Sequence, residues 1–208
     1  MMRTLTPITL QEVSFAFAET PILDRFTLHI EPGRIVALLG PSGCGKSTLL
    51  RLLAGLSVPA SGEIRFGDRL VASAGWGLPP EQRDIGMVFQ DYALWPHMSV
   101  AQNVAFPLRM RGVSRSERER RVSEALARAI VAAPRVLLFD EPLSNLDSEL
   151  RESLCGEMSR LLRQLGITAL YVTHDRREAE LLADQIVYLS AGRVAAVRAV
   201  TPTSGEVA

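Results

Sequence analysis

The length and composition of the chain indicate a single folded domain of ordinary globular content. It has 208 residues, of which 47% are hydrophobic and 22% are charged, so it can bury a full core. Its 23 basic and 23 acidic residues cancel, which leaves no electrostatic footprint for nucleic acid or an anionic membrane surface. The apolar runs are too short to cross a bilayer, and the N-terminus lacks the apolar core of a signal peptide. We therefore expect a cytoplasmic protein that does not bind nucleic acid.

The first strands are indicated by their polar and apolar alternation. Residues 8–17 and 26–30 alternate in this way and lie between Thr-Pro and Pro-Gly pairs, which is typical of antiparallel strands. Residues 35–39, IVALL, form a continuous apolar run, the pattern of a strand buried on both faces. Further strands are expected at 85–89, 136–139, 169–172 and 186–189.

Helical segments alternate with these buried strands. They are expected at 46–54, 100–106, 115–132, 148–165 and 176–183. Along 148–165 the apolar residues recur at spacings of four and three, so one face of that helix should pack on a sheet. Alternating strands and helices predict an α/β fold with a mainly parallel sheet in a three-layer core. The last residues, 198–208, are expected to form a loose tail.

Cysteine, histidine and lysine usage narrows the possible sites. Two cysteines in a chain of this size make no disulfide framework, and three histidines without a C-x-x-C pair fit a structural zinc site poorly. All basic residues but one are arginine, and the exception is Lys46. A lysine at this position, in a chain that otherwise uses arginine, indicates that the site needs the compact charge of an ammonium rather than the planar guanidinium of arginine. Survival of one lysine by chance is the alternative.

The segment GPSGCGKST, residues 40–48, fits the phosphate-binding pattern G-x-x-x-x-G-K-[ST]. It lies between a predicted strand and a predicted helix, and a chance match in a chain of this length has odds of roughly 1%. Its glycines let N–H groups turn toward a phosphate, and the helix N-terminus adds about half a positive charge. The residues expected to contact the nucleotide are Gly40, Ser42, Gly43, Cys44, Gly45, Lys46, Ser47 and Thr48.

Within this loop we expect Lys46 to reach the β- and γ-phosphates, Ser47 to ligate Mg²⁺ and Thr48 to contact the α-phosphate. Cys44 also fits a position that accepts any small residue. A plain glycine-rich turn is the alternative for the whole segment.

An acidic pair ends the apolar run at 136–139. Burying a carboxylate without a partner costs several kcal/mol, so Asp140 and Glu141 need water or a cation. The carboxyl ends of parallel strands form the ligand-binding edge of a sheet, which would place both acids beside the phosphates. We expect Asp140 to hold Mg²⁺ through its water shell and Glu141 to polarise a water for attack on the γ-phosphate. A solvated strand end is the alternative.

Nearly the whole chain resembles the ATP-binding subunit of an ABC transporter. GPSGCGKST and VLLFDE resemble the Walker A and Walker B segments, and SNLD at 144–147 resembles the D-loop. Gln90 resembles the Q-loop glutamine, which senses Mg²⁺ and the attacking water, and His174 resembles the switch histidine that contacts the γ-phosphate. The resemblance implies a P-loop NTPase core at 1–90 and 134–197, with an N-terminal antiparallel β subdomain and a helical subdomain at 91–133.

The base of the nucleotide is expected to be adenine. Phe17 stands where the family usually has a tyrosine that stacks on adenine, and a phenylalanine ring can still stack; a core position is the alternative for it. A small-molecule kinase or GTPase would share the phosphate loop. The Asn-Lys-x-Asp guanine motif is absent, since Lys46 is the only lysine.

One family segment has no counterpart in the sequence. The signature Leu-Ser-Gly-Gly-Gln, which begins the helix that leads into the Walker B strand, is missing between Gln90 and Asp140. The pattern of the helical subdomain suggests that a segment is missing between residues 127 and 128, so that 121–127 is joined directly to the end of the signature helix at 128–134. In the family two subunits sandwich two ATP molecules, and the signature of one subunit donates to the γ-phosphate held by the other. We therefore expect ATP and Mg²⁺ binding with weakened or absent cooperative hydrolysis.

The leading hypothesis is the ATPase subunit of an ABC importer, peripheral on the inner face of the cell membrane. Its segments resemble importers for spermidine/putrescine, ferric iron, sulfate and maltose. The implied partners are two transmembrane permease subunits, a second ATPase subunit in a homodimer or pair and, indirectly, a periplasmic or extracellular solute-binding protein. The alternative is a hydrolysis-deficient nucleotide-binding module. Soluble ABC proteins of DNA repair or translation are disfavoured, because the chain has one nucleotide site, no long coiled coil and no basic excess.

Overall fold

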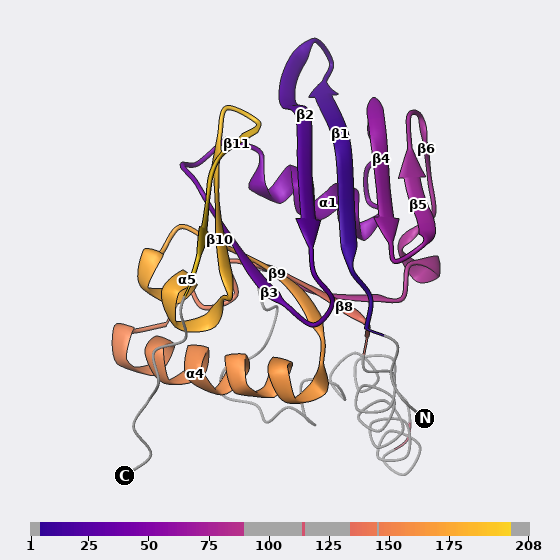
Figure 1. Cartoon of the computed structure of the whole chain (residues 1–208). Coiled ribbons are helices and arrows are strands. Elements are labelled where there is room, and N and C mark those ends of the chain that lie inside the picture. The colour runs from indigo at the N-terminus through magenta and orange to yellow at the C-terminus, as the bar shows by residue number, and fades with distance from the viewer. Residues whose placement is uncertain (1–4, 90–113, 115–133, 145, 201–208) are drawn as a thin grey trace. The chain divides into compact units, whose positions relative to one another are not determined.

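Figure 1 shows a computed structural model of the chain, which describes residues 5–89, 114, 134–144 and 146–200. The backbone divides into two compact units, one formed by 1–90 with 135–208 and the other by 91–134. All of the elements below belong to the first unit. The helices predicted at 100–106 and 115–132 fall outside the described residues.

The first sheet is antiparallel throughout and contains the N-terminal strands. Its strands lie in the order β2-β1-β4-β5-β6 (Figure 1). They are β1 (Ile8–Phe17), β2 (Thr20–Ile30), β4 (Ser61–Phe66), β5 (Arg69–Ser73) and β6 (Trp76–Gly77). Strand β1 is an inner strand, because Ile8 pairs with Ile30 of β2 on one side and with Phe66 of β4 on the other. The strand predicted at 26–30 is the second half of β2.

The second sheet carries the strands that position the site. Its order is β11-β10-β3-β9-β8-β7, and every pair is parallel except β10 with β11. The strands are β3 (Ile35–Leu39), β7 (Ile85–Val88), β8 (Val136–Asp140), β9 (Thr168–Thr173), β10 (Gln185–Ser190) and β11 (Arg193–Ala199). All residues of β3 and β9 are buried, as a strand covered on both faces requires.

Helices cover both faces of this second sheet. The helices are α1 (Lys46–Ala54), α4 (Ser148–Leu165) and α5 (Arg176–Leu182), with a short 3-10 turn at Pro80–Gln82. Alternate residues of β3 point to opposite faces. Val36 and Leu38 join a core with α1 and the first sheet, and Ile35 and Ala37 join a core with α4 and α5. The predicted three-layer order is thus observed, with α1 packed between the two sheets.

The C-terminus of α1 is fixed by a glycine turn and a buried arginine. Gly55 has φ of 80°, and the amides of Gly55 and Leu56 bond back to Leu52 and Arg51, which is the Schellman pattern that satisfies the last carbonyls of a helix. Arg83 is 2% exposed and donates from Nη1 to the carbonyls of Leu52 and Leu53 at 2.6 and 2.9 Å. Burial lowers the pKa of Arg83 to about 10, so the side chain remains charged at neutral pH.

Predicted and observed bounds agree closely for two helices and differ at the C-terminus. The helices predicted at 46–54 and 148–165 match α1 and α4, and α5 is one residue shorter than predicted. The predicted end of the core at residue 197 is wrong. Strand β11 continues, since Arg198 pairs with Ile186 and Ala199 with Gln185. In the described parts of the chain, no helix combines the length and apolar character needed to cross a membrane.

We predict that Arg83→Ala destabilises the fold by about 2–4 kcal/mol, because it leaves buried helix carbonyls without their charged donor. Urea unfolding of the purified chain measures this effect. Arg69→Ala, at an exposed position, serves as the matched control and should change stability by less than about 0.5 kcal/mol. An equal effect of the two substitutions would contradict the assigned role of Arg83.

Candidate functional site

Two glycines of the loop between β3 and α1, Gly40 and Gly45, leave no room for a side chain. Gly45 has φ of 108°, and a Cβ there would lie 2.9 Å from Leu23 Cδ2 and 3.1 Å from the Ile22 carbonyl oxygen. A Cβ at Gly40 would meet the Leu189 carbonyl oxygen at 2.4 Å. The loop therefore packs tightly against β2 and β10. Gly43, with φ of 79°, has open space around it.

Lys46 opens α1 with its side chain directed back into this loop. It is only 7% exposed, and its ammonium donates to the carbonyl oxygens of Gly40 at 2.7 Å and Pro41 at 3.0 Å. No side chain caps the start of the helix. The N-terminal amides of α1 therefore lack a side-chain acceptor and carry the positive end of the helix dipole toward the loop.

Two of the three predicted metal-site residues, Ser47 and Asp140, meet in the structure, and the third, Gln90, lies outside the described residues. The Ser47 hydroxyl donates to Asp140 Oδ1 at 3.4 Å, across 93 residues of sequence. Burial, the largest effect, and then the adjacent Glu141 raise the pKa of Asp140, while Ser47 and Lys46 offset this only in part. A carboxylate in this setting gains from a nearby cation, because a cation favours its ionised form.

The chemistry of these oxygens fits magnesium. A hydroxyl and a carboxylate are hard oxygen ligands, and Mg²⁺ binds through one or two such groups with waters and nucleotide phosphates completing its shell. Among the described residues no cluster of three or more His, Cys, Asp or Glu side chains forms a metal cage. Ser47 and Asp140 together supply the one or two protein oxygens that such a magnesium site uses.

Glu141 and His174 form a second pair at the same edge. His174 Nδ1 lies 2.8 Å from Glu141 Oε2, and the side chains are 64% and 20% exposed respectively. Strand β9 lies between β3 and β8, with Thr173 beside Leu39 and Val172 beside Asp140. His174 follows β9, which lies between β3, the strand before the glycine loop, and β8, the strand that ends at Asp140. Glu141 has φ of 46°, an uncommon conformation for a residue with a side chain.

Two hollows border the loop and share Ser42 and Glu141. One has a volume of about 310 Å³ and is lined by Ile22, Ser42, Gly43, Gly45, Lys46, Ser47, Thr48 and Glu141. The other, of about 600 Å³, is lined by Leu39, Gly40, Pro41, Ser42, Glu141, His174, Arg176 and Tyr188. All of the predicted phosphate-loop residues except Cys44 line one or both hollows together with Glu141, whereas Asp140 lines neither. The sequence analysis did not name five of the lining residues as contacts: Ile22, Leu39, Pro41, Arg176 and Tyr188. Leu39, Pro41 and Arg176 lie within two residues of predicted site residues, whereas Ile22 and Tyr188 had no such local signal.

Phe17 does not line either hollow. Phe17 is 52% exposed at the end of β1 and packs edge-to-face on Phe15, with ring centroids 4.9 Å apart. Adenine contact by Phe17 thus stays a prediction. Gln90 lies outside the described residues.

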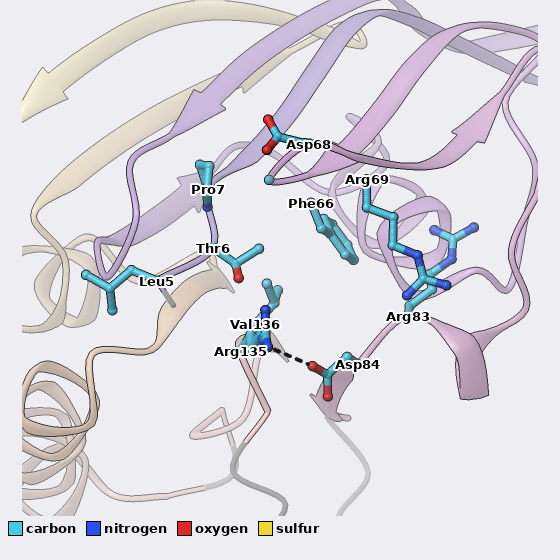
Figure 2. Close-up of a pocket in the computed structure, with 11 residues that line it drawn as sticks. Leu5, Thr6, Pro7, Phe66, Asp68, Arg69, Arg83, Asp84, Arg135 and Val136 are labelled. Atoms are coloured by element: carbon cyan, nitrogen blue, oxygen red, sulfur yellow. Dashed lines mark ion pairs between the residues drawn. The ribbon is translucent and has the colours of Figure 1, made fainter. Parts of the chain in front are cut away.

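A further hollow lies at the opposite ends of the parallel strands. Its volume is about 390 Å³, and its lining includes Arg69, Arg83, Asp84, Arg135 and Val136 (Figure 2). Arg135 Nε and Asp84 Oδ2 are paired across it at 3.4 Å. It borders the amino ends of β7 and β8, whereas Asp140 stands at the carboxyl end of β8. It contains none of the predicted site residues.

Comparison with known proteins identifies the family of the chain. The sequence profile described as "ABC transporter" matches residues 23–126, half of the 208 residues. The chain belongs to the ABC transporter family. Its predicted family and its P-loop α/β fold class are both confirmed.

Several import proteins of the ABC family are similar to this chain. An sn-glycerol-3-phosphate import ATP-binding protein of Rhizobium johnstonii is 43% identical, with 91% of this chain and 58% of that protein covered. The trehalose/maltose import ATP-binding protein of Thermococcus litoralis is 44% identical, with 89% and 57% covered. A spermidine/putrescine import ATP-binding protein of Pseudomonas aeruginosa is 44% identical, with 91% and 59% covered. The chain spans less than two thirds of the length of these relatives.

Solved ABC structures share the fold. The ATP-binding cassette MJ0796, in a dimeric post-hydrolysis state bound to ADP and Pi, aligns with a TM-score of 0.70 and 27% sequence identity. The alignment covers 93% of this chain and 99% of that one.

We predict that Asp140→Asn raises the melting temperature of the nucleotide-free chain at pH 7. The pKa of Asp140 in the folded chain lies above its ordinary value, which is its pKa in the unfolded chain. At pH values between these two pKa values the folded chain binds more protons than the unfolded chain, so stability falls as pH rises through this range and stays lower above it. Asparagine does not ionise, so Asp140→Asn avoids this loss of stability. Thermal unfolding between pH 4 and pH 8 measures it, with exposed Glu157→Gln as control. A lower melting temperature for Asp140→Asn at pH 7 would show the assignment to be wrong.

Proposed function

We propose that the chain binds ATP with Mg²⁺ and forms the ATPase part of an ABC importer. The observation that carries the proposal is the approach of Ser47 to Asp140 at 3.4 Å. It brings the end of the phosphate loop to the acidic edge where the Glu141–His174 pair also lies. Family membership and the import proteins at 43–44% identity support the same function.

Each residue has a distinct task in this proposal. Lys46 and the loop amides bind the β- and γ-phosphates, and Ser47 and Asp140 hold the metal. When bound, Mg²⁺ supplies positive charge against the phosphate oxygens. Glu141 accepts a proton from a water aligned with the γ-phosphate, and His174, within 2.8 Å of Glu141, orients that carboxylate and contacts the γ-phosphate. Gln90 as the Q-loop glutamine and Phe17 as the adenine-stacking ring complete the proposed site.

The proposed partners are two permease subunits and a second ATPase subunit. The relatives are named as import ATP-binding proteins, and the similar MJ0796 cassette is dimeric. We place the chain on the inner face of the cell membrane, with a solute-binding protein acting through the permease. Relatives for chemically different solutes are almost equally similar, at 43–44%, so the similarity supports import in general rather than one solute.

The alignment lengths support the proposal that this chain lacks residues present in its relatives. The alignment to the Rhizobium johnstonii protein runs over 216 positions and includes 91% of this chain. Because 91% of 208 residues is about 189, about 27 positions have no counterpart in this chain. Removing one preorganised donor to a transition state costs about 3 kcal/mol, and a missing signature removes several.

Nucleotide binding is tested by substituting the only lysine. We predict that Lys46→Ala weakens MgATP affinity by at least about tenfold, because it removes a charge-assisted donor to the phosphates. Isothermal titration calorimetry with the full chain measures the affinity, and Glu141→Gln serves as a control that keeps binding. Unchanged affinity in Lys46→Ala would refute the phosphate-binding role.

Hydrolysis is tested by restoring the missing segment. We predict that the chain as it stands hydrolyses ATP slowly, and that inserting the signature region of a relative between residues 127 and 128 raises turnover by about 10²-fold or more. Phosphate release measures turnover, and Glu141→Gln in the insertion variant should abolish the gain. Brisk hydrolysis by the original chain, lost in Glu141→Gln, would contradict the proposed defect. Binding with no turnover in either form would fit a nucleotide-binding module.

A further inference from the structure

A single guanidinium links the two segments that carry Glu141 and His174. Arg151 lies in the first turn of α4, with its side chain 22% exposed. Its Nη2 donates to the carbonyl oxygen of Leu146 at 2.6 Å, and its Nη1 donates to Asp175 Oδ2 at 2.9 Å. Leu146 belongs to the loop that follows Glu141, and Asp175 directly follows His174. Arg151 itself touches neither member of the pair through a hydrogen bond.

Asp175 is held at both carboxylate oxygens. Its Oδ1 accepts from the amides of Arg177 and Glu178 at 2.7 and 3.3 Å and so caps α5, which leaves Oδ2 for Arg151. Burial alone would raise the pKa of Asp175, but these hydrogen bonds outweigh it and the pKa lies below its usual value. The backbone immediately after His174 is therefore fixed from two directions.

A buried glutamate completes the connection to β9. Glu178 is 3% exposed, and its Oε2 accepts hydrogen bonds from Tyr171 and Thr173, both at 2.8 Å. Arg151 Nε faces Oε1 of Glu178 at 3.4 Å. The Thr173 hydroxyl also accepts from the Asp175 amide at 3.0 Å. Arg151 thus balances two carboxylates that surround the end of β9, from which His174 projects.

We propose that Arg151 is a positioning residue that keeps His174 within hydrogen-bonding distance of Glu141 by tying Asp175 to the carbonyl of Leu146. The proposal rests on the proposed function, since the pair matters only if a γ-phosphate reaches it. Its action is indirect: the arginine fixes the backbone on each side of the site and leaves the imidazole and carboxylate free to face the nucleotide.

The variants are chosen so that the fold survives. Arg151→Met leaves Asp175 and Glu178 without their cation, so it risks unfolding the chain. Arg151→Lys keeps the charge but presents one compact ammonium in place of a planar fork, so it cannot hold Leu146 and Asp175 with the same geometry. Arg163→Met is the matched control, because Arg163 lies on the same helix and pairs with Asp184, away from both segments.

Hydrogen exchange tests the structural links without nucleotide. In Arg151→Lys we expect faster amide exchange in peptides covering both 141–147 and 173–178, and in Arg163→Met we expect no change in either. Unchanged exchange in both peptides of Arg151→Lys would overturn the proposal. This measurement needs no nucleotide, so it tests the role of Arg151 even if the chain does not bind MgATP. A failure to bind MgATP would refute the proposed function and not the structural links.

Nucleotide selectivity tests the action on His174. Only a triphosphate reaches the pair, so Arg151→Lys should weaken affinity for a non-hydrolysable MgATP analogue by about three- to tenfold, the coupling typical of one hydrogen-bond network, and leave MgADP affinity unchanged. His174→Ala should show the same pattern, and the double variant should be no weaker than His174→Ala alone. Equal weakening of both nucleotides, or losses that add in the double variant, would show Arg151 to be merely structural and overturn the proposal.

Discussion

The parallel register of β3, β9 and β8 is the constraint on which the site depends. Leu39 lies beside Thr173, and Asp140 lies beside Val172, so the three strands end together at one edge. The residues that follow those strands are the phosphate loop, His174 and Glu141. A shift of one residue in any strand would move an entire side-chain set to the other face of the sheet. Burial of all eleven residues of β3 and β9 makes such a shift costly.

Helix α1 transmits this constraint to the loop. Seven of its nine residues are buried, and four leucines, Leu49, Leu50, Leu52 and Leu53, pack between the two sheets with no exposed surface. Its far end is closed by Gly55 and Arg83. The start of the helix is consequently held in place by packing rather than by a capping side chain, which leaves its amides available to an anion. A binding edge made of main-chain donors needs this kind of rigid support.

The sequence was sufficient for the buried strands and the phosphate loop, because continuous apolar runs and fixed glycine spacing are local signals. Short hairpin strands were missed, although Gly67 and Asp68 between β4 and β5, and Ala191 and Gly192 between β10 and β11, are two-residue turns of the hairpin kind. Contacts such as Arg151 with Asp175 join segments 24 residues apart. Their formation depends on how α4 and α5 pack, which no periodicity encodes. The same holds for Ile22, whose carbonyl lies against Gly45 only after β2 has folded onto the loop.

The isolation of Lys46 has a practical consequence for protein chemistry. As the only lysine, it provides the single peptide bond that a lysine-specific protease can recognise, at the junction of the loop and α1. Its ammonium is shielded by the carbonyls of Gly40 and Pro41, so cutting requires local opening of the loop between β3 and α1. Limited digestion would therefore release two fragments of about 46 and 162 residues at a rate set by that opening. Cross-linkers that join pairs of lysine side chains, by the same reasoning, would miss every contact within this chain.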